Sequence, residues 1–262
     1  MANAPSERPM RHNQRTNAVT RDRYDAVLLD LDGVITDTAS LHAACWKQMF
    51  DEYLRKLAAE RSTNFLPFDP ATDYRVYVDG KPRAEGVRSF LSARGIELPE
   101  GDDASDPPGA ETVSGLGNRK NELVNKAIEA SGVQAYEGSV QFIRQLRQHG
   151  FKIAVVTSSQ NCSTVLRAVA LDDAFDAQVD GNVIRERQLA GKPAPDTFLT
   201  AAKLLEVKPA RAVVIEDAIS GVQAGCDGGF GLVIGVARKG NAEELQQHGA
   251  HVVVTDLSEL LD

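Results

Sequence analysis

Short runs of apolar residues alternate along the chain with longer segments of helical periodicity. The runs are rich in β-branched side chains, have the length of a strand and end in polar residues. They cover Ala26–Leu29, Ile153–Val156, Val213–Ile215, Leu232–Ile234 and His251–Val254. Their alternation with helical segments predicts an α/β fold built on a doubly wound parallel sheet.

Four of the intervening segments have the signals of helices. Asn or Ser residues stand near their starts, and Gly150 and Gly249 follow two of them. The predicted helices are Ser139–Gln148, Asn161–Val169, Thr197–Leu205 and Ala242–Gln247.

The region from Thr38 to Gly132 breaks this alternation, because it contains no convincing buried strand. A segment rich in Gly, Pro, Asp and Ser, Leu98–Gly117, is predicted to be a surface loop. The predicted helices of this region are Leu41–Ala59, Val87–Ala93 and Lys120–Ala130.

This pattern divides the chain into parts. We expect residues 24–37 and 133–262 to form a core domain, and residues 38–132 to be a helical cap domain inserted after the first strand. Residues 1–23 are rich in Asn, Arg, Pro and Ser and lack the apolar run of a secretory signal, so we expect a disordered N-terminal extension.

Composition excludes several classes of protein. The formal net charge of −8 argues against a nucleic-acid binder, which needs a basic face. No segment approaches the roughly 20 apolar residues of a membrane span. The cysteines Cys45, Cys162 and Cys226 have no spacing typical of zinc sites or disulfide frameworks, which fits a reducing cytoplasm. We expect a cytoplasmic monomer that binds neither nucleic acid nor membrane.

Reactive side chains follow the predicted strands at their carboxyl ends, where open parallel sheets bind ligands. In chain order they are Asp30, Asp32, Thr157, Glu216 and Asp217, and Lys192 joins them from the loop before the predicted helix Thr197–Leu205. A single Asp after a strand is more often a helix cap or turn former. Carboxylates in this number repel one another unless a cation lies among them, and oxygen ligands suit Mg²⁺. The set therefore predicts a site that handles phosphate.

Four segments in this order resemble the motifs of the haloacid dehalogenase (HAD) superfamily. They are Asp30–Thr38 (DLDGVITDT), Val155–Ser158 (VVTS), Gly191–Asp196 (GKPAPD) and Ile215–Val222 (IEDAISGV). The match runs from about Tyr24 to the C-terminus. It implies a HAD core with a Rossmann-like sheet.

The helical insertion is similar to the cap of the β-phosphoglucomutase-like branch of that superfamily. His42 and Trp46 lie one helical turn apart and match this branch. Alternatively, Trp46 is part of the cap core and His42 is its satisfied neighbour.

The segment Tyr77–Arg83 takes the place of the cap specificity loop of this branch, with Gly80, Lys81 and Arg83 as the matching substrate residues. The resemblance implies that Arg83 holds the phosphate that does not react, since a guanidinium suits bidentate phosphate binding. One departure is Asp79, which stands where the best-known members have a lysine, and Lys81 is a candidate replacement.

Lys120 matches another substrate-contacting cap position. An exposed lysine at a helix start explains it equally well.

The resemblance assigns a role to each core residue. Asp30 would be the nucleophile that becomes an aspartyl phosphate, and Asp32 the general acid/base. Mg²⁺ would be held by Asp30, the Asp32 carbonyl, Glu216 and Asp217, while Lys192 and Thr157 stabilise phosphoryl oxygens. The residues implied to complete the substrate site are Thr38, Ser158, Ser159 and Asn161, although Asn161 also suits a helix cap.

The implied reaction converts β-D-glucose 1-phosphate to glucose 6-phosphate through β-glucose 1,6-bisphosphate, which also serves as activator. A sugar-phosphate phosphatase, which uses water as acceptor, is the main alternative. A catalytically inactive binding module would not need so many clustered carboxylates. A dinucleotide-binding protein is excluded, because no GxGxxG follows the first predicted strand.

Overall fold

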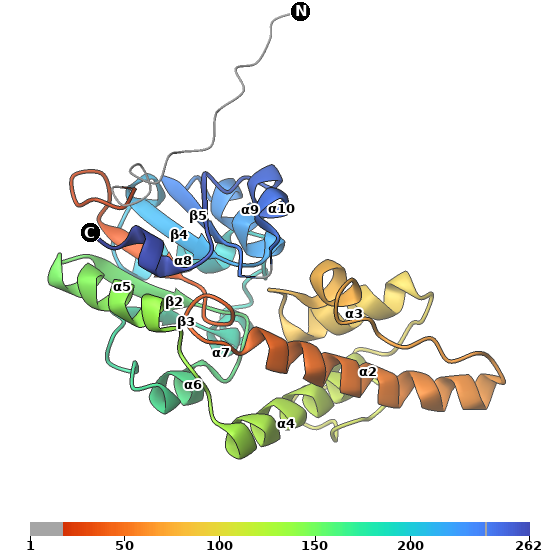
Figure 1. The fold of residues 1–262 in the computed structure, drawn as a ribbon. Helices are drawn as coiled ribbons and strands as arrows, with labels where there is room; N and C mark the ends of the chain where they lie inside the picture. Colours follow the sequence, from red (N-terminus) through yellow and green to blue (C-terminus); the bar gives the residue numbers. More distant parts are fainter. Residues whose placement is uncertain (1–17, 239) are drawn as a thin grey trace, which may run out of the picture.

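A six-stranded parallel sheet forms the centre of the larger part of the molecule (Figure 1). The computed structural model describes residues 18–238 and 240–262. The strands lie in the order β3-β2-β1-β4-β5-β6, which confirms the doubly wound topology. They are β1 (Ala26–Leu29), β2 (Lys152–Val156), β3 (Ala177–Val179), β4 (Ala212–Glu216), β5 (Leu232–Val236) and β6 (Val252–Val254).

Helices cover both faces of this sheet because successive strand residues point to opposite sides. In β1, Val27 and Leu29 belong to one buried cluster with side chains of α5, α6 and η3, while Ala26 and Leu28 belong to another with side chains of α8, α9 and α10. The helices of this part are α5 (Glu137–Gln148), α6 (Cys162–Ala168), α7 (Gly181–Glu186), α8 (Asp196–Leu204), α9 (Ile219–Asp227) and α10 (Ala242–Gln247), with 3-10 turns η2 (Pro209–Arg211) and η3 (Leu257–Leu260).

The insertion after β1 is helical, as predicted, and we refer to residues 38–132 as the cap. Its elements are α2 (Ala39–Arg61), a π-helical turn η1 (Tyr74–Val78), α3 (Arg83–Ala93) and α4 (Val113–Ser131). The rings of Trp46 and Phe50 stack with centroids 5.3 Å apart, and Phe50 also packs on Phe68 and Phe90. The cap, which lies beside the sheet (Figure 1), therefore contains a cluster of packed aromatic rings.

Some elements were not predicted from the sequence, and one predicted loop is too long. The missing elements are the strand β3, the helices α7 and α9, and the short turns η1, η2 and η3. Strand β3 has three residues, of which Ala177 and Gln178 are only partly buried. The glycines of α9 weaken its helical signal, yet Gly225 fits where a Cβ would lie 3.1 Å from Val214 and Val233. The predicted loop Leu98–Gly117 is wrong at its end, because α4 begins at Val113, where Thr112 caps the helix.

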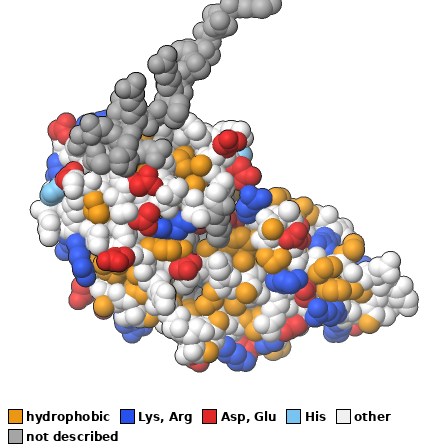
Figure 2. Space-filling model, viewed as in Figure 1, with side chains coloured by type: hydrophobic (Ala, Val, Ile, Leu, Met, Phe, Trp, Pro, Cys, Tyr) orange, Lys and Arg blue, Asp and Glu red, His pale blue; other side chains and the backbone are white. Residues whose placement is uncertain are grey.

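The predicted extension Met1–Arg23 falls mostly outside the described residues, which begin at Ala18. Residues 18–23 pack on the core: Ala18 is buried, and Arg21 donates hydrogen bonds to the carbonyls of Tyr24 and Asp25. Among the residues described, no helix is long and apolar enough to cross a membrane. On the face shown in Figure 2, Lys and Arg side chains are interspersed with Asp and Glu.

Candidate active site

The sheet register brings the predicted motif residues to one edge. Leu29 of β1 is in register with Val155 of β2 and Ile215 of β4, so the residues that follow these strands lie at one level. The amide of Asp30 donates to the Ile215 carbonyl at 3.0 Å, which extends this alignment by one residue. The site therefore begins where β1, β2 and β4 end.

Lys192 is fully buried between two carboxylates. Its Nζ lies 2.5 Å from Asp30 Oδ1 and 2.6 Å from Glu216 Oε1, and it also donates to the Val156 carbonyl at 3.2 Å. Burial, opposed by Lys192, raises the pKa of Asp30 well above its usual value. Burial alone would lower the pKa of Lys192, but Asp30 and Glu216 outweigh it and raise that pKa. The ammonium therefore stays charged beside the predicted nucleophile.

Asp32 accepts hydrogen bonds from the cap side of the site. The Thr38 hydroxyl donates to Asp32 Oδ1, and His42 Nε2 lies 3.4 Å from the same oxygen. Burial of Asp32 favours its neutral form, but His42 and Thr38 outweigh this effect and lower its pKa to about 2. Thr38 is held in turn by Thr36, with the two hydroxyl oxygens 2.8 Å apart.

Lys120 lies next to His42 in the cap interior. Its Nζ is 2.7 Å from His42 Nδ1 and 5.1 Å from the centroid of the Trp46 ring. Lys120 is 8% exposed and lies two turns inside α4, so the alternative of an exposed lysine at a helix start is wrong. Burial lowers the pKa of Lys120 to about 8. Trp46 is part of the cap core and also faces the site.

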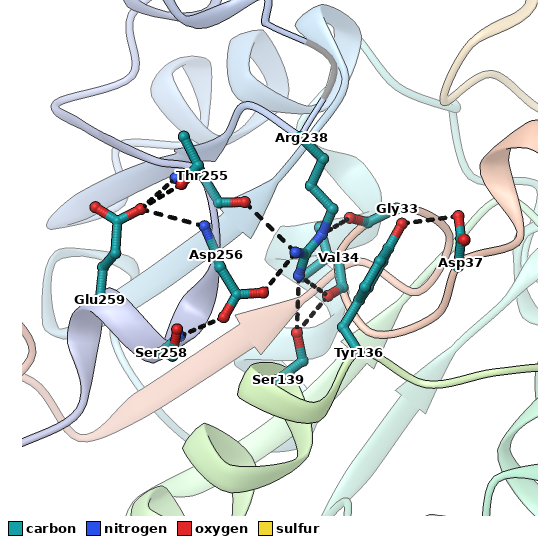
Figure 3. A network of polar contacts seen from close by, with 10 residues as sticks. All are labelled: Gly33, Val34, Asp37, Tyr136, Ser139, Arg238, Thr255, Asp256, Ser258 and Glu259. Atoms are coloured by element: carbon teal, nitrogen blue, oxygen red, sulfur yellow. Dashed lines mark hydrogen bonds and ion pairs between the residues drawn. The ribbon is translucent and has the colours of Figure 1, made fainter.

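The loop that carries Asp30 and Asp32 is fastened by Arg238, which follows β5 (Figure 3). Arg238 donates to the carbonyls of Gly33 at 3.0 Å and Val34 at 3.3 Å. The same guanidinium donates to Asp256 at 2.6 Å and to the Ser139 hydroxyl at 3.1 Å. One side chain thereby ties the loop after β1 to the C-terminal segment and to α5.

Tyr136 joins the two chain segments that connect cap and core. Its hydroxyl donates to Asp37 Oδ1 at 2.9 Å, and its ring lies 3.4 Å from the guanidinium carbon of Arg238 (Figure 3). Asp37 precedes the cap and Tyr136 follows it, so this contact fixes the spacing between the two connections.

Asp217 lies against the loop after β1. Gly33 has a φ of +92°, and a Cβ there would come within 2.1 Å of Asp217 Oδ2, so both backbone conformation and space require glycine. Within residues 18–238 and 240–262, no three His, Cys, Asp or Glu side chains stand in the arrangement of a metal site. In this structure Lys192 fills the space between Asp30 and Glu216.

The charge and chemistry of this group nevertheless fit a divalent cation. Asp30, Asp32, Glu216 and Asp217 line one cavity and offer carboxylate oxygens, which Mg²⁺ prefers. Lys192 compensates only part of their negative charge, and the repulsion from Glu216 and Asp32 contributes to the raised pKa of Asp30.

A cavity of about 430 Å³ lies between the cap and the carboxyl edge of the sheet. All but two of the site residues predicted from the sequence line it. The exceptions are Thr38 and Lys192, which are buried in contact with Asp32 and Asp30. The lining residues are Asp30, Asp32, His42, Trp46, Gly80, Lys81, Arg83, Lys120, Thr157, Ser158, Ser159, Asn161, Glu216 and Asp217.

The cap segment Tyr77–Arg83 contacts the core through hydroxyl groups. Ser158 donates to the Gly80 carbonyl at 2.7 Å, and Ser220 donates to the Asp79 carbonyl at 2.9 Å. Lys81 lines the cavity, but its amino group donates to the Val76 carbonyl and the Ser89 hydroxyl within the cap.

The segment after β2 forms a polar turn. The Thr157 hydroxyl accepts from the Ser159 amide at 3.1 Å, and the Ser159 hydroxyl accepts from the Asn161 amide at 3.2 Å. Asn161 makes no side-chain capping bond to α6; its amide group donates instead to Asn121 of the cap at 3.2 Å.

Sequence reasoning missed several residues of the cavity. Arg83 donates to Asp103 at 3.0 Å and to Gln160 at 3.1 Å, and Asp103 also pairs with Arg185 at 2.8 Å. Gln160 follows the second motif closely, between the predicted site residues Ser159 and Asn161, and this position could have indicated it as a site residue. Asp103 and Arg185 lie 82 residues apart outside any motif, and no signal in the sequence links them.

The sequence is similar to a known protein family and to several of its members. A family model described as haloacid dehalogenase-like hydrolase matches residues 24–229. The β-phosphoglucomutases of Mycobacterium bovis and Mycobacterium tuberculosis are each 52% identical over 243 residues, which cover 92% of this chain and 92% of each relative. The β-phosphoglucomutase of Bacillus subtilis is 34% identical over 236 residues, 90% of this chain and 91% of that protein.

Solved structures have the same fold. A β-phosphoglucomutase from Clostridium difficile superposes with a TM-score of 0.71 at 26% identity, covering 90% of this chain and 93% of that one. A hydrolase from Pseudomonas syringae gives the same TM-score at 23% identity, with coverage of 90% and 95%.

Proposed function

The chain belongs to the haloacid dehalogenase-like hydrolase family, and from this premise we propose that its cavity is the active site of a β-phosphoglucomutase. The enzyme interconverts β-D-glucose 1-phosphate and glucose 6-phosphate. The observation that carries the proposal is a cavity that brings together Asp30 and Asp32 from the core and Arg83 from the cap. A substrate that carries a second phosphate matches such a site.

Asp30 is the nucleophile. One of its oxygens bonds to the phosphorus of β-glucose 1,6-bisphosphate, the bond from phosphorus to the sugar oxygen breaks, and that oxygen takes a proton from Asp32. In the other half-reaction the 6-hydroxyl of β-D-glucose 1-phosphate attacks the phosphorus of the aspartyl phosphate, the bond from phosphorus to Asp30 breaks, and Asp32 receives the hydroxyl proton that it gives up in the first half-reaction. The bisphosphate is thus both intermediate and activator.

Lys192 and Thr157 stabilise charge on the transferred group. Lys192 already contacts Asp30 and remains charged when buried. It can therefore neutralise negative charge on the oxygens of the phosphoryl group during transfer. Mg²⁺ is the proposed cofactor, held by Asp30, the Asp32 carbonyl, Glu216 and Asp217, and it would neutralise phosphoryl oxygen charge.

The cap governs access to Asp30. We propose residues 38–132 as a separate domain that admits substrate by opening and excludes water when closed. Thr38 and His42 reach Asp32 from this domain in the structure. In the closed state, the cap residues that face the sugar are His42, Trp46, Gly80, Lys81 and Lys120.

The remaining substrate residues complete the phosphate sites. Ser158, Ser159 and Asn161 line the core wall of the cavity, and their hydroxyl and amide groups can donate to a phosphate once Ser158 and Asn161 exchange their bonds to Gly80 and Asn121 of the cap. Arg83 supplies a charged donor opposite them, on the side of the phosphate that does not react.

A coupled assay with Mg²⁺ tests the proposal. It follows glucose 6-phosphate formed from β-D-glucose 1-phosphate, primed with a trace of bisphosphate, while free phosphate is measured in parallel and the α anomer serves as control. Glucose 6-phosphate from the β anomer with little free phosphate supports the mutase. Release of phosphate without isomerisation would contradict the mutase and indicate a sugar-phosphate phosphatase, in which water is the acceptor.

Asp30→Asn is the matched variant for the same assay. It preserves size but removes the nucleophile, so turnover should vanish while the protein stays folded. Substantial remaining turnover would remove Asp30 from this role.

A further inference from the structure

One carboxylate joins two arginines across the mouth of the cavity. Asp103 Oδ1 lies 3.0 Å from Arg83 of the cap, and Asp103 Oδ2 lies 2.8 Å from Arg185 on α7 of the core. All three residues line the cavity. The two oxygens of a single anion thus connect cap and core.

We propose that Asp103 occupies an anion subsite built by Arg83 and Arg185, and that the non-reacting phosphate of the substrate displaces it there. Arg185 then becomes a second phosphate-binding residue, and Asp103 an internal competitor. This inference rests on the proposed function, because it concerns the remote phosphate of the same substrate.

Charge favours this exchange. Two guanidinium groups carry two positive charges, of which one carboxylate neutralises one, whereas a phosphate dianion neutralises both. Retaining Asp103 beside the bound dianion would leave excess negative charge. The phosphate also has three oxygens to offer, so it can engage both arginines as Asp103 does.

The Asp103 side chain can leave without unfolding its loop. The Asn118 amide group donates to the main-chain carbonyls of Asp103 at 3.1 Å and Asp106 at 3.0 Å, which holds the backbone in place. Rotation of the side chain is therefore sufficient for release. The side chains of Asp103 and Arg185 are 31% and 59% exposed, and such ion pairs contribute little to stability because water competes for them.

Arg83 is the better fixed of the two arginines. Its side chain is only 13% exposed, and it also donates to Gln160 at 3.1 Å. Arg185 comes from the core, so a phosphate held by both would link the closed cap to the core. The subsite thereby makes closure of the cap depend on a substrate whose phosphate lies away from the reacting hydroxyl.

Two substitutions test the subsite through KM for β-D-glucose 1-phosphate in the coupled assay. Arg185→Gln should raise this KM about tenfold more than the KM for p-nitrophenyl phosphate, because the phosphate of the sugar is the remote one when its 6-hydroxyl attacks the aspartyl phosphate, whereas the only phosphate of p-nitrophenyl phosphate is the one transferred. Asp103→Asn keeps the shape but removes the competing charge, so it should lower the KM for the sugar phosphate about threefold or more. The control is Arg187→Gln, an exposed arginine nearby that does not line the cavity.

The outcomes separate this inference from the proposed function. If the wild type makes glucose 6-phosphate and Arg185→Gln leaves both KM values unchanged, Arg185 is not in the subsite. A higher KM for the sugar phosphate in Asp103→Asn would make Asp103 a structural link rather than a competitor. A wild type that makes no glucose 6-phosphate overturns the proposed function itself.

Discussion

His42 Nε2 lies 3.4 Å from Asp32 Oδ1, so an imidazole of the cap touches the carboxylate proposed as acid/base in the core. Thr38 donates to the same oxygen from the start of the cap. In the proposed mechanism, proton transfer at Asp32 would therefore depend on a group that reaches it only when the cap is closed. This contact would favour transfer to a sugar over transfer to water, which can enter an open site.

Replacing His42 by Gln should slow the mutase reaction by about 100-fold in kcat, because Asp32 loses the group that positions it. KM for β-D-glucose 1-phosphate should change less than kcat, since the phosphate-binding residues remain. Steady-state kinetics check this prediction. His149→Gln, an exposed histidine, is the control. An unchanged kcat in His42→Gln would remove His42 from the proton-transfer step.

Lys120 should make the stability of the protein depend on pH. Its pKa is about 8 in the folded protein against 10.5 for an unperturbed lysine, so the unfolded state binds more protons between these values. The free energy of unfolding should therefore rise from pH 8 to pH 10.5, by on the order of 2–3 kcal/mol, and lose this gain below pH 8. Lys120→Met should abolish the rise and increase stability at pH 7.

Urea denaturation at several pH values measures this effect. Lys126→Met, on the exposed face of the same helix, should keep the rise because Lys126 is 63% exposed. A wild-type stability that is flat between pH 8 and pH 10.5 would contradict a buried, protonated Lys120. Lys120→Met should also lower mutase activity, because charges buried at active sites often serve function at a cost in stability.

The sequence predicted most of the sheet and of the site because local signals were sufficient for both. A run such as Ala26–Leu29 is apolar throughout, and the residues that follow it carry the first motif. Strand β3 lacked this signal, since Gln178 interrupts it and its burial is partial. Its place in the sheet depends on pairing with β2, which is a tertiary effect.

Contacts between distant segments could not be predicted. The burial of Lys120 follows from the packing of α4 on α2, where His42 and Trp46 lie, and a lysine by itself favours an exposed position. Arg238 has no neighbouring motif, yet it fastens the loop after β1. Sequence patterns predict which face of a helix or strand is buried and where the element ends. The roles of Lys120 and Arg238 depend on tertiary contacts between elements, which such patterns do not contain.

Arg238→Leu should destabilise the protein by about 2–4 kcal/mol, because it leaves carbonyls and Asp256 without their donor. It should also reduce kcat, since the loop with Asp30 and Asp32 loses its anchor. Arg238→Lys keeps the charge but lacks the several donors of a guanidinium group. Its stability and kcat should therefore lie between those of Arg238→Leu and the wild type. Denaturation and kinetics with the same preparations check both effects; equal stability of all three proteins would contradict the anchoring role.

Removal of the divalent cation should abolish turnover, because Asp30, Glu216 and Asp217 then face a phosphate with Lys192 as their main counter-charge. Asp217 lies against Gly33, so Asp217→Asn keeps the packing and changes only the charge. We expect the Mg²⁺ concentration for half-maximal activity to rise by about 10–100-fold in this variant. Asp227→Asn, exposed at the end of α9, should leave it unchanged. Activity that survives a chelator would contradict a requirement for the cation, and an unaltered Mg²⁺ dependence in Asp217→Asn would place the cation elsewhere.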